Sequence, residues 1–180
     1  MLNQRGQESA VFELLIAIIV MGFVIVVGFN ALSVLEEKTC QGTLNQNLEE
    51  IRTAIETVVK NKSKTNVNFR LPNCFPEKES KLRIVERDSA QFCSSICEGS
   101  VKQCTILSFS SPTYSESKCL RISSATNFPD ASTCSPDQLL EGDYEAIEWK
   151  RFGVQPGDYT LIRQSTLFSA SPVICVYRRK

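Results

Sequence analysis

Eight cysteines are the side chains of this 180-residue chain that are best placed to do chemistry, as metal ligands or as disulfides. Structural zinc sites usually combine closely paired cysteines and often include histidine. Cys93, Cys97 and Cys104 are separated by wider gaps, and the chain contains no histidine. An even number of cysteines in a modest exported domain is typical of a disulfide framework. We therefore expect disulfides and no metal site, with the pairing left open, for Cys40, Cys74, Cys93, Cys97, Cys104, Cys119, Cys134 and Cys175.

The absence of histidine also bears on catalysis, because it removes the most common general base. Neither a Ser-His-Asp nor a Cys-His arrangement can be built from these residues. Carboxylate pairs such as Glu145/Glu148 and Asp137/Glu141 have a spacing that is ordinary for surface residues. We expect no catalytic residue, no cofactor and no enzyme. The 20 basic and 20 acidic residues balance, so no long-range field favours nucleic acid as a partner.

A carboxylate, Glu13, stands at the start of an apolar run of 22 residues, 14–35, that only Gly22, Gly28, Asn30 and Ser33 interrupt. About 20 apolar residues suffice for a helix to cross a bilayer, so the run predicts a membrane span. The apolar region of a cleaved secretory signal is shorter, about 7–15 residues, which argues against that alternative.

Glu13 has two interpretations, because a carboxylate near the end of a membrane helix costs a few kcal/mol unless it is paired or hydrated. It either pairs with a group of a neighbouring subunit or lies hydrated at the cytoplasmic interface.

The glycines also leave alternatives open. Gly22 and Gly28 permit close helix approach, mark points of local helix melting in a packed bundle, or are simply tolerated as in other membrane helices.

Charge and cysteine placement give the orientation. Arg5 precedes the apolar run, and Glu36, Glu37 and Lys38 follow it, which places the N-terminus in the cytoplasm by the positive-inside tendency. All eight cysteines lie beyond the run, as expected for a domain in an oxidising compartment outside the cell.

The elements that must position these residues begin with a second helical pattern. Leu44, Leu48, Ile51 and Ile55, followed by Val58 or Val59, recur at helical spacing, and charged residues occupy the opposite face. This pattern predicts an amphipathic helix that ends near Lys60 and packs on a sheet of its own domain. Asn61 opens an Asn-Lys-Ser sequon just beyond it, which makes Asn61 a candidate glycosylation site.

The remainder of the chain has a sequence pattern typical of β-structure, in which short runs of β-branched and aromatic residues alternate with turn residues. Strands are predicted at 67–71, 81–85, 104–109, 118–123, 146–152, 159–163 and 173–178. The segments 145–152 and 158–163, on either side of Gln155-Pro156-Gly157, are predicted to form a hairpin. A short helix within 88–97 would bring Cys93 and Cys97 onto one face.

The N-terminal residues carry a family resemblance. Arg5-Gly6-Gln7-Glu8-Ser9, followed by Glu13 and the apolar run, is similar to the class III signal peptide of archaeal prepilins, members of the type IV pilin superfamily. In that family a membrane prepilin peptidase cuts after the glycine, which implies cleavage between Gly6 and Gln7. The family's glutamate is the fifth residue of the mature chain, whereas here Val11 holds that place and Glu13 is the seventh.

The resemblance implies an α+β, type IV pilin-like fold, in which a long N-terminal helix packs on a disulfide-linked antiparallel β head. Four parts are expected: a leader, 1–6; a membrane and filament-core helix, 7–35; an amphipathic extension, 36–62; and a cystine-rich head, 63–180. Glu13, Gly22 and Gly28 would serve subunit assembly.

The implied function is that of a structural subunit of an extracellular filament that serves adhesion or surface attachment. The precursor would lie in the membrane, N-terminus in, before joining the filament. Its partners would be further copies of itself, the prepilin peptidase, the pilus assembly platform and, before assembly, the lipid bilayer. The alternative is a binding or sensor domain on a permanent single-span anchor that never polymerises.

Overall fold

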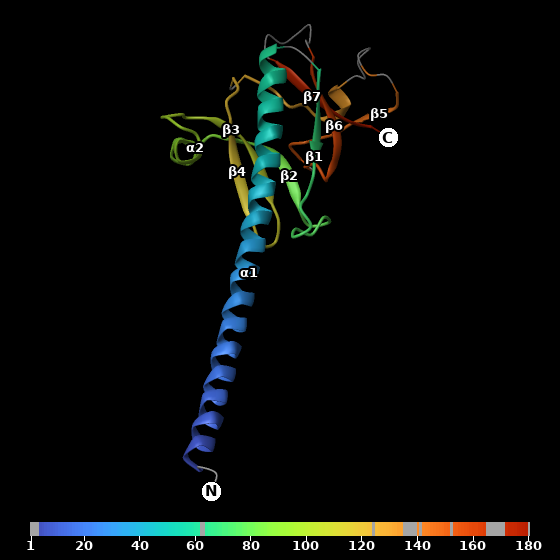
Figure 1. The fold of residues 1–180 in the computed structure, drawn as a ribbon. Coiled ribbons are helices and arrows are strands. Elements are labelled where there is room, and N and C mark those ends of the chain that lie inside the picture. The colour runs from blue at the N-terminus through green and yellow to red at the C-terminus, as the bar shows by residue number, and fades with distance from the viewer. Residues whose placement is uncertain are drawn as a thin grey trace. The chain divides into compact units, whose positions relative to one another are not determined.

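The computed structural model describes residues 4–61, 64–123, 125–134, 140, 142–151, 153–164 and 172–179, with side chains from residue 12 onward. The chain divides into two compact units, Met1–Gln41 and Gly42–Lys180, and each is described by itself. Helix α1, Gln4–Asn61, contributes to both units, and the strands all belong to the second unit, the head (Figure 1).

In the first unit α1 is helical throughout its described length, and two of its hydroxyl side chains bond to the backbone of the helix itself. Ser33 Oγ donates to the carbonyl of Asn30 at 2.9 Å, and Thr39 Oγ1 donates to the carbonyl of Leu35 at 2.8 Å. Hydroxyl side chains within helices commonly make such bonds to the preceding turn. These bonds satisfy the two hydroxyl donors without any group outside the helix.

In the head, α1 is amphipathic as its sequence predicts. Leu44, Leu48, Ile51, Ile55 and Val58 are each at most 1% exposed. Full burial of such a side chain stabilises the folded state by about 1.5–3 kcal/mol, so this stripe fixes the helix on the domain. The prediction of a helix that packs on the sheets of its own domain is confirmed.

The C-terminal end of α1 is held by a strand. The helix ends at Asn61, one residue beyond the predicted boundary. The guanidinium of Arg163, in strand β6, Gly157–Gln164, donates to the carbonyl of Val59 in the last turn. Carbonyls in the last turn have no partner within the helix, so this cation satisfies one of them and complements the helix dipole.

The larger sheet is antiparallel with the order β1-β6-β7-β5, from β1 Lys64–Phe69, β6 Gly157–Gln164, β7 Val173–Arg179 and β5 Tyr144–Ala146. The central strands β6 and β7 carry continuous runs of buried residues. Alternate side chains of a strand point to opposite faces, so both faces of the sheet are covered here. Leu161 and Val176 lie on the face that bears Arg163 and α1, and Ile162 and Cys175 lie on the opposite face.

The smaller sheet is an antiparallel meander in the order β2-β3-β4, from β2 Lys81–Arg87, β3 Cys104–Ser110 and β4 Ser115–Leu120. One face carries the fully buried Leu82, Ile84, Leu107 and Phe109, which complete the core with the apolar stripe of α1. The other face carries Cys104, Ile106 and Cys119, and helix α2, Ala90–Ile96, lies on this face.

Aromatic rings join the two sheets. Phe109 makes edge-to-face contacts with Phe69 of β1 at 6.5 Å and with Phe75 at 5.4 Å between ring centroids. Phe75 also packs on Tyr114, whose hydroxyl donates to Glu116 at 2.7 Å. Burial, followed by this hydrogen bond and the charge of Glu116, raises the pKa of Tyr114 to about 12.

A backbone bridge connects the smaller sheet to the segment that leads into β6. Leu82 and Val154 exchange two backbone hydrogen bonds, of 2.8 and 3.2 Å. Trp149 adds a third bond, since its indole N–H donates to the Leu82 carbonyl at 3.0 Å. Gly153 has a φ of +73°, and a Cβ there would lie 2.8 Å from the side chain of Arg83. The close approach of the two segments therefore requires glycine at this position.

Several predicted strands lie elsewhere than expected. The first strand is Lys64–Phe69 in place of 67–71, and the fourth is Ser115–Leu120 in place of 118–123. The prediction of a strand at 146–152 is wrong beyond Ala146, because the chain turns at 149–151 and buries Trp149 from that turn. Phe152 lies outside the described residues.

The predicted hairpin between 145–152 and 158–163 is also wrong. Strand β5 pairs with β7, and β6 pairs with β1 and β7. The Pro156-Gly157 segment instead leads from Val154, at the bridge to the smaller sheet, into β6. The turn residues correctly indicate where the chain bends. Which strands pair is decided by contacts between segments that are distant in sequence.

Candidate functional site

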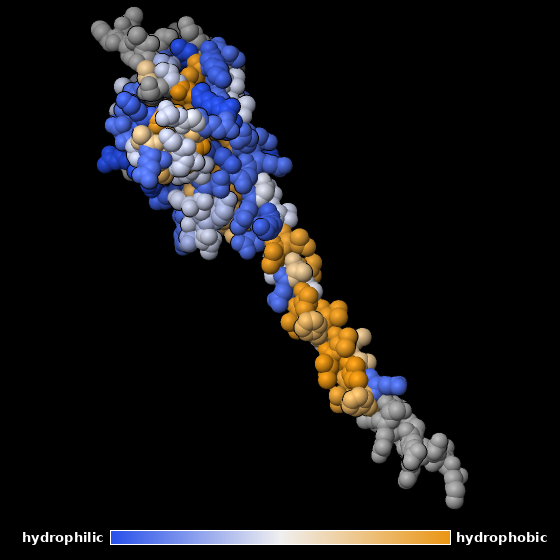
Figure 2. Space-filling model, turned by 90° about the vertical axis from the view of Figure 1, so that its left-hand side faces the viewer, coloured by the Kyte–Doolittle hydropathy of each residue, from blue (hydrophilic) through white to orange (hydrophobic). Residues whose placement is uncertain are grey.

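The first feature with functional meaning is the apolar surface of α1 in the first unit. Each large apolar side chain from Phe12 to Leu35 is between 46% and 69% exposed. These residues occupy consecutive helical positions and so lie on all sides of the helix, and Figure 2 shows one side of this apolar surface. Among the described residues, α1 is the helix that is long and apolar enough to cross a membrane. A helix that is apolar all round is typical of a membrane span or of the centre of a bundle.

The residues predicted to serve processing and assembly lie on this segment. The backbones of Gly6 and Gln7 lie within α1, and Glu13 lies one turn before Ala17 at the start of the exposed apolar surface. Apart from the adjacent residues and backbone of α1 itself, no atom of the described residues lies within 4 Å of where a Cβ would stand at Gly22 or Gly28. Both glycines therefore leave shallow gaps in the apolar surface.

The cysteines form disulfides. Three bridges are Cys93–Cys104, Cys97–Cys119 and Cys134–Cys175, with Cα atoms 5.6, 5.2 and 5.8 Å apart. Cys40 and Cys74 are disulfide-bonded as well. The expectation of a disulfide framework is confirmed, and the structure supplies pairings that spacing could not.

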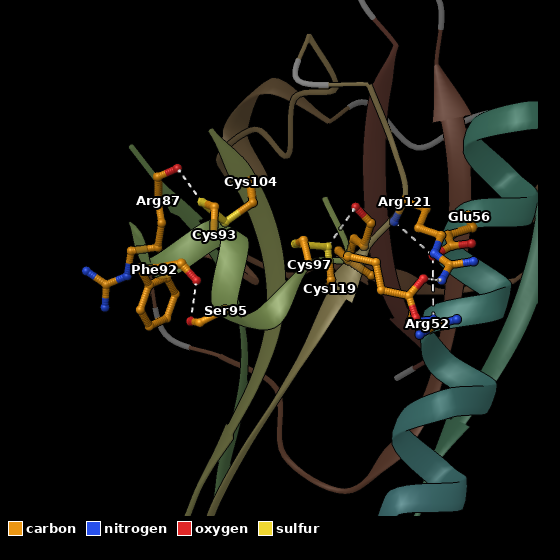
Figure 3. Close-up of a disulfide and its surroundings, with 12 residues drawn as sticks. Arg52, Glu56, Arg87, Phe92, Cys93, Ser95, Cys97, Cys104, Cys119 and Arg121 are labelled. Atoms are coloured by element: carbon orange, nitrogen blue, oxygen red, sulfur yellow. Dashed lines mark hydrogen bonds and ion pairs between the residues drawn. A yellow bond between two sulfur atoms is a disulfide. The ribbon is translucent and has the colours of Figure 1, made fainter. Parts of the chain in front are cut away.

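Two of these bridges hold α2 on the smaller sheet. Cys93 in α2 and Cys97 at its C-terminal end bond to Cys104 on β3 and to Cys119 on β4 (Figure 3). Both cysteines therefore lie on one side of the short helix, as predicted, and that side is turned to the smaller sheet. Ser89 begins the helix as an N-cap, with its hydroxyl accepting from the backbone N–H of Phe92. A helix of seven residues is marginal without such support.

The third bridge joins a loop to the outer face of the larger sheet. Cys134 follows the short 3-10 helix η1, Ala131–Thr133, and bonds to Cys175 at the centre of β7. Around them a small core buries Ile162, Val173 and Tyr177. This bridge covers the second face of the larger sheet with a segment that contains little regular structure.

A cavity of about 610 Å³ opens beside α2, and we call it the head cleft. Its walls are the C-terminal end of β2, the start of β3, the second half of β4, the segment after α2, and Arg52 of α1. The Cys97–Cys119 bridge lies in one wall (Figure 3). Sequence reasoning missed this site, although Glu98 directly follows one cysteine and Arg121 closely follows another.

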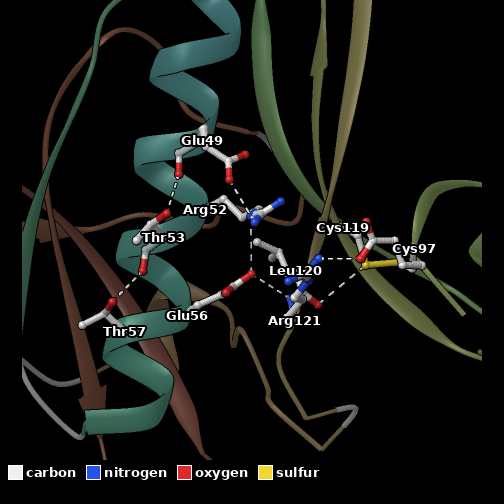
Figure 4. Close-up of polar contacts among 10 residues, drawn as sticks. Glu49, Arg52, Thr53, Glu56, Thr57, Cys97, Cys119, Leu120 and Arg121 are labelled. Carbon is white, nitrogen blue, oxygen red and sulfur yellow. Dashed lines mark hydrogen bonds and ion pairs between the residues drawn. A yellow bond between two sulfur atoms is a disulfide. The ribbon is translucent and has the colours of Figure 1, made fainter.

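A chain of alternating charges runs from α1, beside the head cleft, to the segment after α2, and Figure 4 shows it from Glu49 to Arg121. Arg52 contacts Glu49 at 2.9 Å and Glu56 at 3.5 Å. Glu56 also accepts a 2.9 Å bond from the backbone N–H of Arg121, whose guanidinium pairs with Glu98 at 2.8 Å. Each acid in this chain thus faces a positive or donating group.

The other residues singled out by sequence do not form a site with these. Glu145 lies on β5, one Glu148 oxygen is buried without a hydrogen-bond partner, and Asp137 and Glu141 lie outside the described residues. Within the described ranges, no three His, Cys, Asp or Glu side chains are grouped as a metal ion would require. Asn61, the glycosylation candidate, is the exposed last residue of α1.

Comparison of the chain with protein-family models, with curated proteins and with solved structures gave no match.

Proposed function

We propose that this chain is the structural subunit of an extracellular filament of the type IV pilus kind, which serves adhesion or surface attachment. The observation that carries the proposal is the apolar surface of α1, exposed on all sides between Phe12 and Leu35 and preceded by Arg5-Gly6-Gln7. Such a surface needs lipid or other helices around it. A filament supplies both in turn, first the membrane and then the neighbouring subunits.

The physics of assembly follows from the same surface. Removing apolar area from water gives about 25 cal/mol per Å², and this is an upper bound here because the helix leaves lipid. Cohesion must therefore also come from close packing, for which Gly22 and Gly28 leave room. The heads would form the outside of the filament, where disulfides stabilise a thin domain against unfolding.

Glu13 would set the register between subunits. Cleavage after Gly6 by a prepilin peptidase creates a new amine at Gln7, and an axially shifted neighbour could bring that amine to Glu13. An ion pair in apolar surroundings is strongly favoured over either charge alone, because isolated charges there cost several kcal/mol. This pairing would draw subunits from the membrane platform into the growing filament.

The second candidate is a binding or sensor domain on a permanent single-span anchor. It uses the same helix and the same head, and the head cleft would suit it equally well. It differs in needing neither cleavage at Gly6 nor a partner for Glu13. Processing and assembly are therefore the properties that separate the two candidates.

A Gly6→Val variant tests the proposal, because the larger side chain blocks the cleavage that the resemblance implies. Native protein and variant would be expressed in the same cells, and sheared surface material would be compared with the membrane fraction. The filament proposal expects native protein in the high-molecular-weight sheared material and the variant only in the membrane. Equal retention of both chains in the membrane would favour the anchored domain.

A further inference from the structure

Five of the seven charged residues that line the head cleft are in ion pairs, and the other two, Arg87 and Asp88, carry opposite charges. Arg52 and Arg121 belong to the alternating chain described above, Lys118 contacts Glu116 at 3.3 Å, and Glu86 contacts Lys150 at 2.6 Å. A charged ligand binds best where an opposite charge is unpaired. Paired charges still offer hydrogen-bonding capacity, so this cleft suits a ligand that is polar and without net charge.

The lining of the head cleft presents donors and acceptors side by side. Guanidinium and ammonium groups only donate, carboxylates only accept, and hydroxyl and amide groups do both. Glu98, Gln103, Thr105, Ser117 and Arg121 bring carboxylate, amide, hydroxyl and guanidinium groups to one cavity. A ligand hydroxyl is donor and acceptor at once, so a ligand rich in hydroxyls can match neighbouring groups of opposite kind.

Apolar surface lies between these polar groups. Ile96, Val101, Leu120 and Ile122 and the Cys97–Cys119 sulfurs line the same cavity. Val101 is 37% exposed, which is unusual for a large apolar residue in the described part of the head. Sugar rings have apolar C–H faces and a rim of hydroxyls, so they combine both kinds of surface that the cavity offers.

We propose that the head cleft binds a short neutral oligosaccharide. Its volume of about 610 Å³ falls within the range of about 300–1,000 Å³ found for small-molecule sites. The bridges Cys93–Cys104 and Cys97–Cys119 fix the walls before the ligand arrives, which lowers the entropic cost of binding. The proposal deepens the adhesive role and its biological meaning rests on it, although binding itself needs only the head.

Arg87 and Phe92 extend this surface beyond the cavity. The Arg87 guanidinium lies 5.6 Å from the centre of the Phe92 ring, and Arg87 also lines the cleft. Phe92 is 36% exposed on α2 (Figure 3). A second sugar ring that leaves the cavity on this side would meet an exposed aromatic side chain whose neighbour supplies donors.

The test uses the full chain in detergent micelles, so that binding is measured without filament formation. Maltotetraose and fully N-acetylated chitotetraose are the neutral probes, and an oligogalacturonate and inorganic phosphate are the charged ones. Saturation-transfer NMR would detect contact, and titration followed through backbone amide signals would give the affinity. Assembly would be scored separately by electron microscopy of sheared material.

A Val101→Trp variant fills the cavity from an exposed loop position, so the head should still fold. Lys78→Trp is the matched control, because it places the same side chain on an exposed turn outside the cleft. We expect a neutral probe to bind the native chain and the control. In the Val101→Trp chain its affinity should fall by roughly tenfold or more, the equivalent of about 1.4 kcal/mol.

Three results would overturn the proposal: no binding of either neutral probe, stronger binding of the charged probes, or equal affinity in the Val101→Trp and Lys78→Trp chains. Filament formation does not enter these results. A chain that binds a neutral probe but never polymerises would refute the filament alone, and a chain that polymerises without binding would refute the oligosaccharide site alone.

Discussion

Removal of individual disulfides should destabilise the head in an order set by chain separation. Cys134 and Cys175 are 41 residues apart, and Cys93 and Cys104 are 11 apart. In the chain-entropy treatment these bridges contribute about 3.9 and about 2.8 kcal/mol at room temperature, because each restricts the unfolded chain in proportion to the logarithm of the loop it closes. Removal of the bridge that closes the longer loop should therefore lower the free energy of unfolding by about 1 kcal/mol more than removal of the other.

The measurement is urea unfolding of the full chain in micelles, followed by the fluorescence of the single tryptophan, Trp149. This residue is 2% exposed and bonded to Leu82 where the smaller sheet meets the segment that leads into β6, so its emission reports on the folding of the head. The variants are the paired alanine substitutions at 134 and 175 and at 93 and 104.

We expect both double variants to unfold at a lower urea concentration than the native chain. The variant that lacks the Cys134–Cys175 bridge should have the lowest midpoint. The burial of both Cys134 and Cys175 in a small core acts in the same direction, since alanine leaves part of that space empty. Equal midpoints, or a larger loss for the shorter loop, would refute the entropic reasoning.

Three further predictions concern the helix, a tyrosine and the membrane segment. Leu48→Ala should lower the free energy of unfolding by about 2–5 kcal/mol, whereas the exposed Gln46→Ala should change it by no more than about 0.5 kcal/mol, both by urea titration. The folded-state pKa of Tyr114, raised to about 12, exceeds that of the unfolded chain. The protonated Tyr114 side chain therefore contributes its full stabilisation below about pH 10, and this stabilisation is lost as the pH rises towards 12. In a Tyr114→Phe variant, the free energy of unfolding should fall less over this pH range, as measured by unfolding at a series of pH values. Glu13→Gln should abolish recovery in sheared filaments without preventing membrane insertion, whereas Glu37→Gln should leave recovery unchanged.

The helical parts of this fold could be predicted because helix formation and burial share one period. Leu44, Leu48, Ile51 and Ile55 repeat at 3.6-residue spacing, and all are buried. Glycine at position 42 did not interrupt the helix. Tertiary packing on the sheets outweighs the cost of about 1 kcal/mol that glycine brings to a helix relative to alanine.

The sheet was less predictable because its signals are not local. Ser115–Leu120 is an edge strand with one fully buried residue, Leu120, so it lacks the alternation by which strands are recognised. Ile147 and Trp149 resemble a strand in sequence, but Trp149 is buried from a turn by its bond to Leu82. Pairing between distant strands, and not the intervening turn, fixed the position of β6.

The candidate sites divide in the same way. The apolar segment with Glu13 is contiguous in sequence, so its character could be predicted directly. The head cleft gathers Arg52 of α1, Arg87 of β2, Glu98 of the segment after α2 and Arg121 of the segment after β4. Only the folded chain, with α2 fixed by its bridge to Cys119, brings those side chains to one cavity.

The most direct test of the filament account is the N-terminal residue of the protein in sheared cell-surface material, determined by mass spectrometry of the intact chain and its terminal peptide. The account predicts a chain that begins at Gln7 and is recovered in a high-molecular-weight fraction. A chain that begins at Met1 and occurs only in the membrane fraction would contradict it and favour the anchored domain.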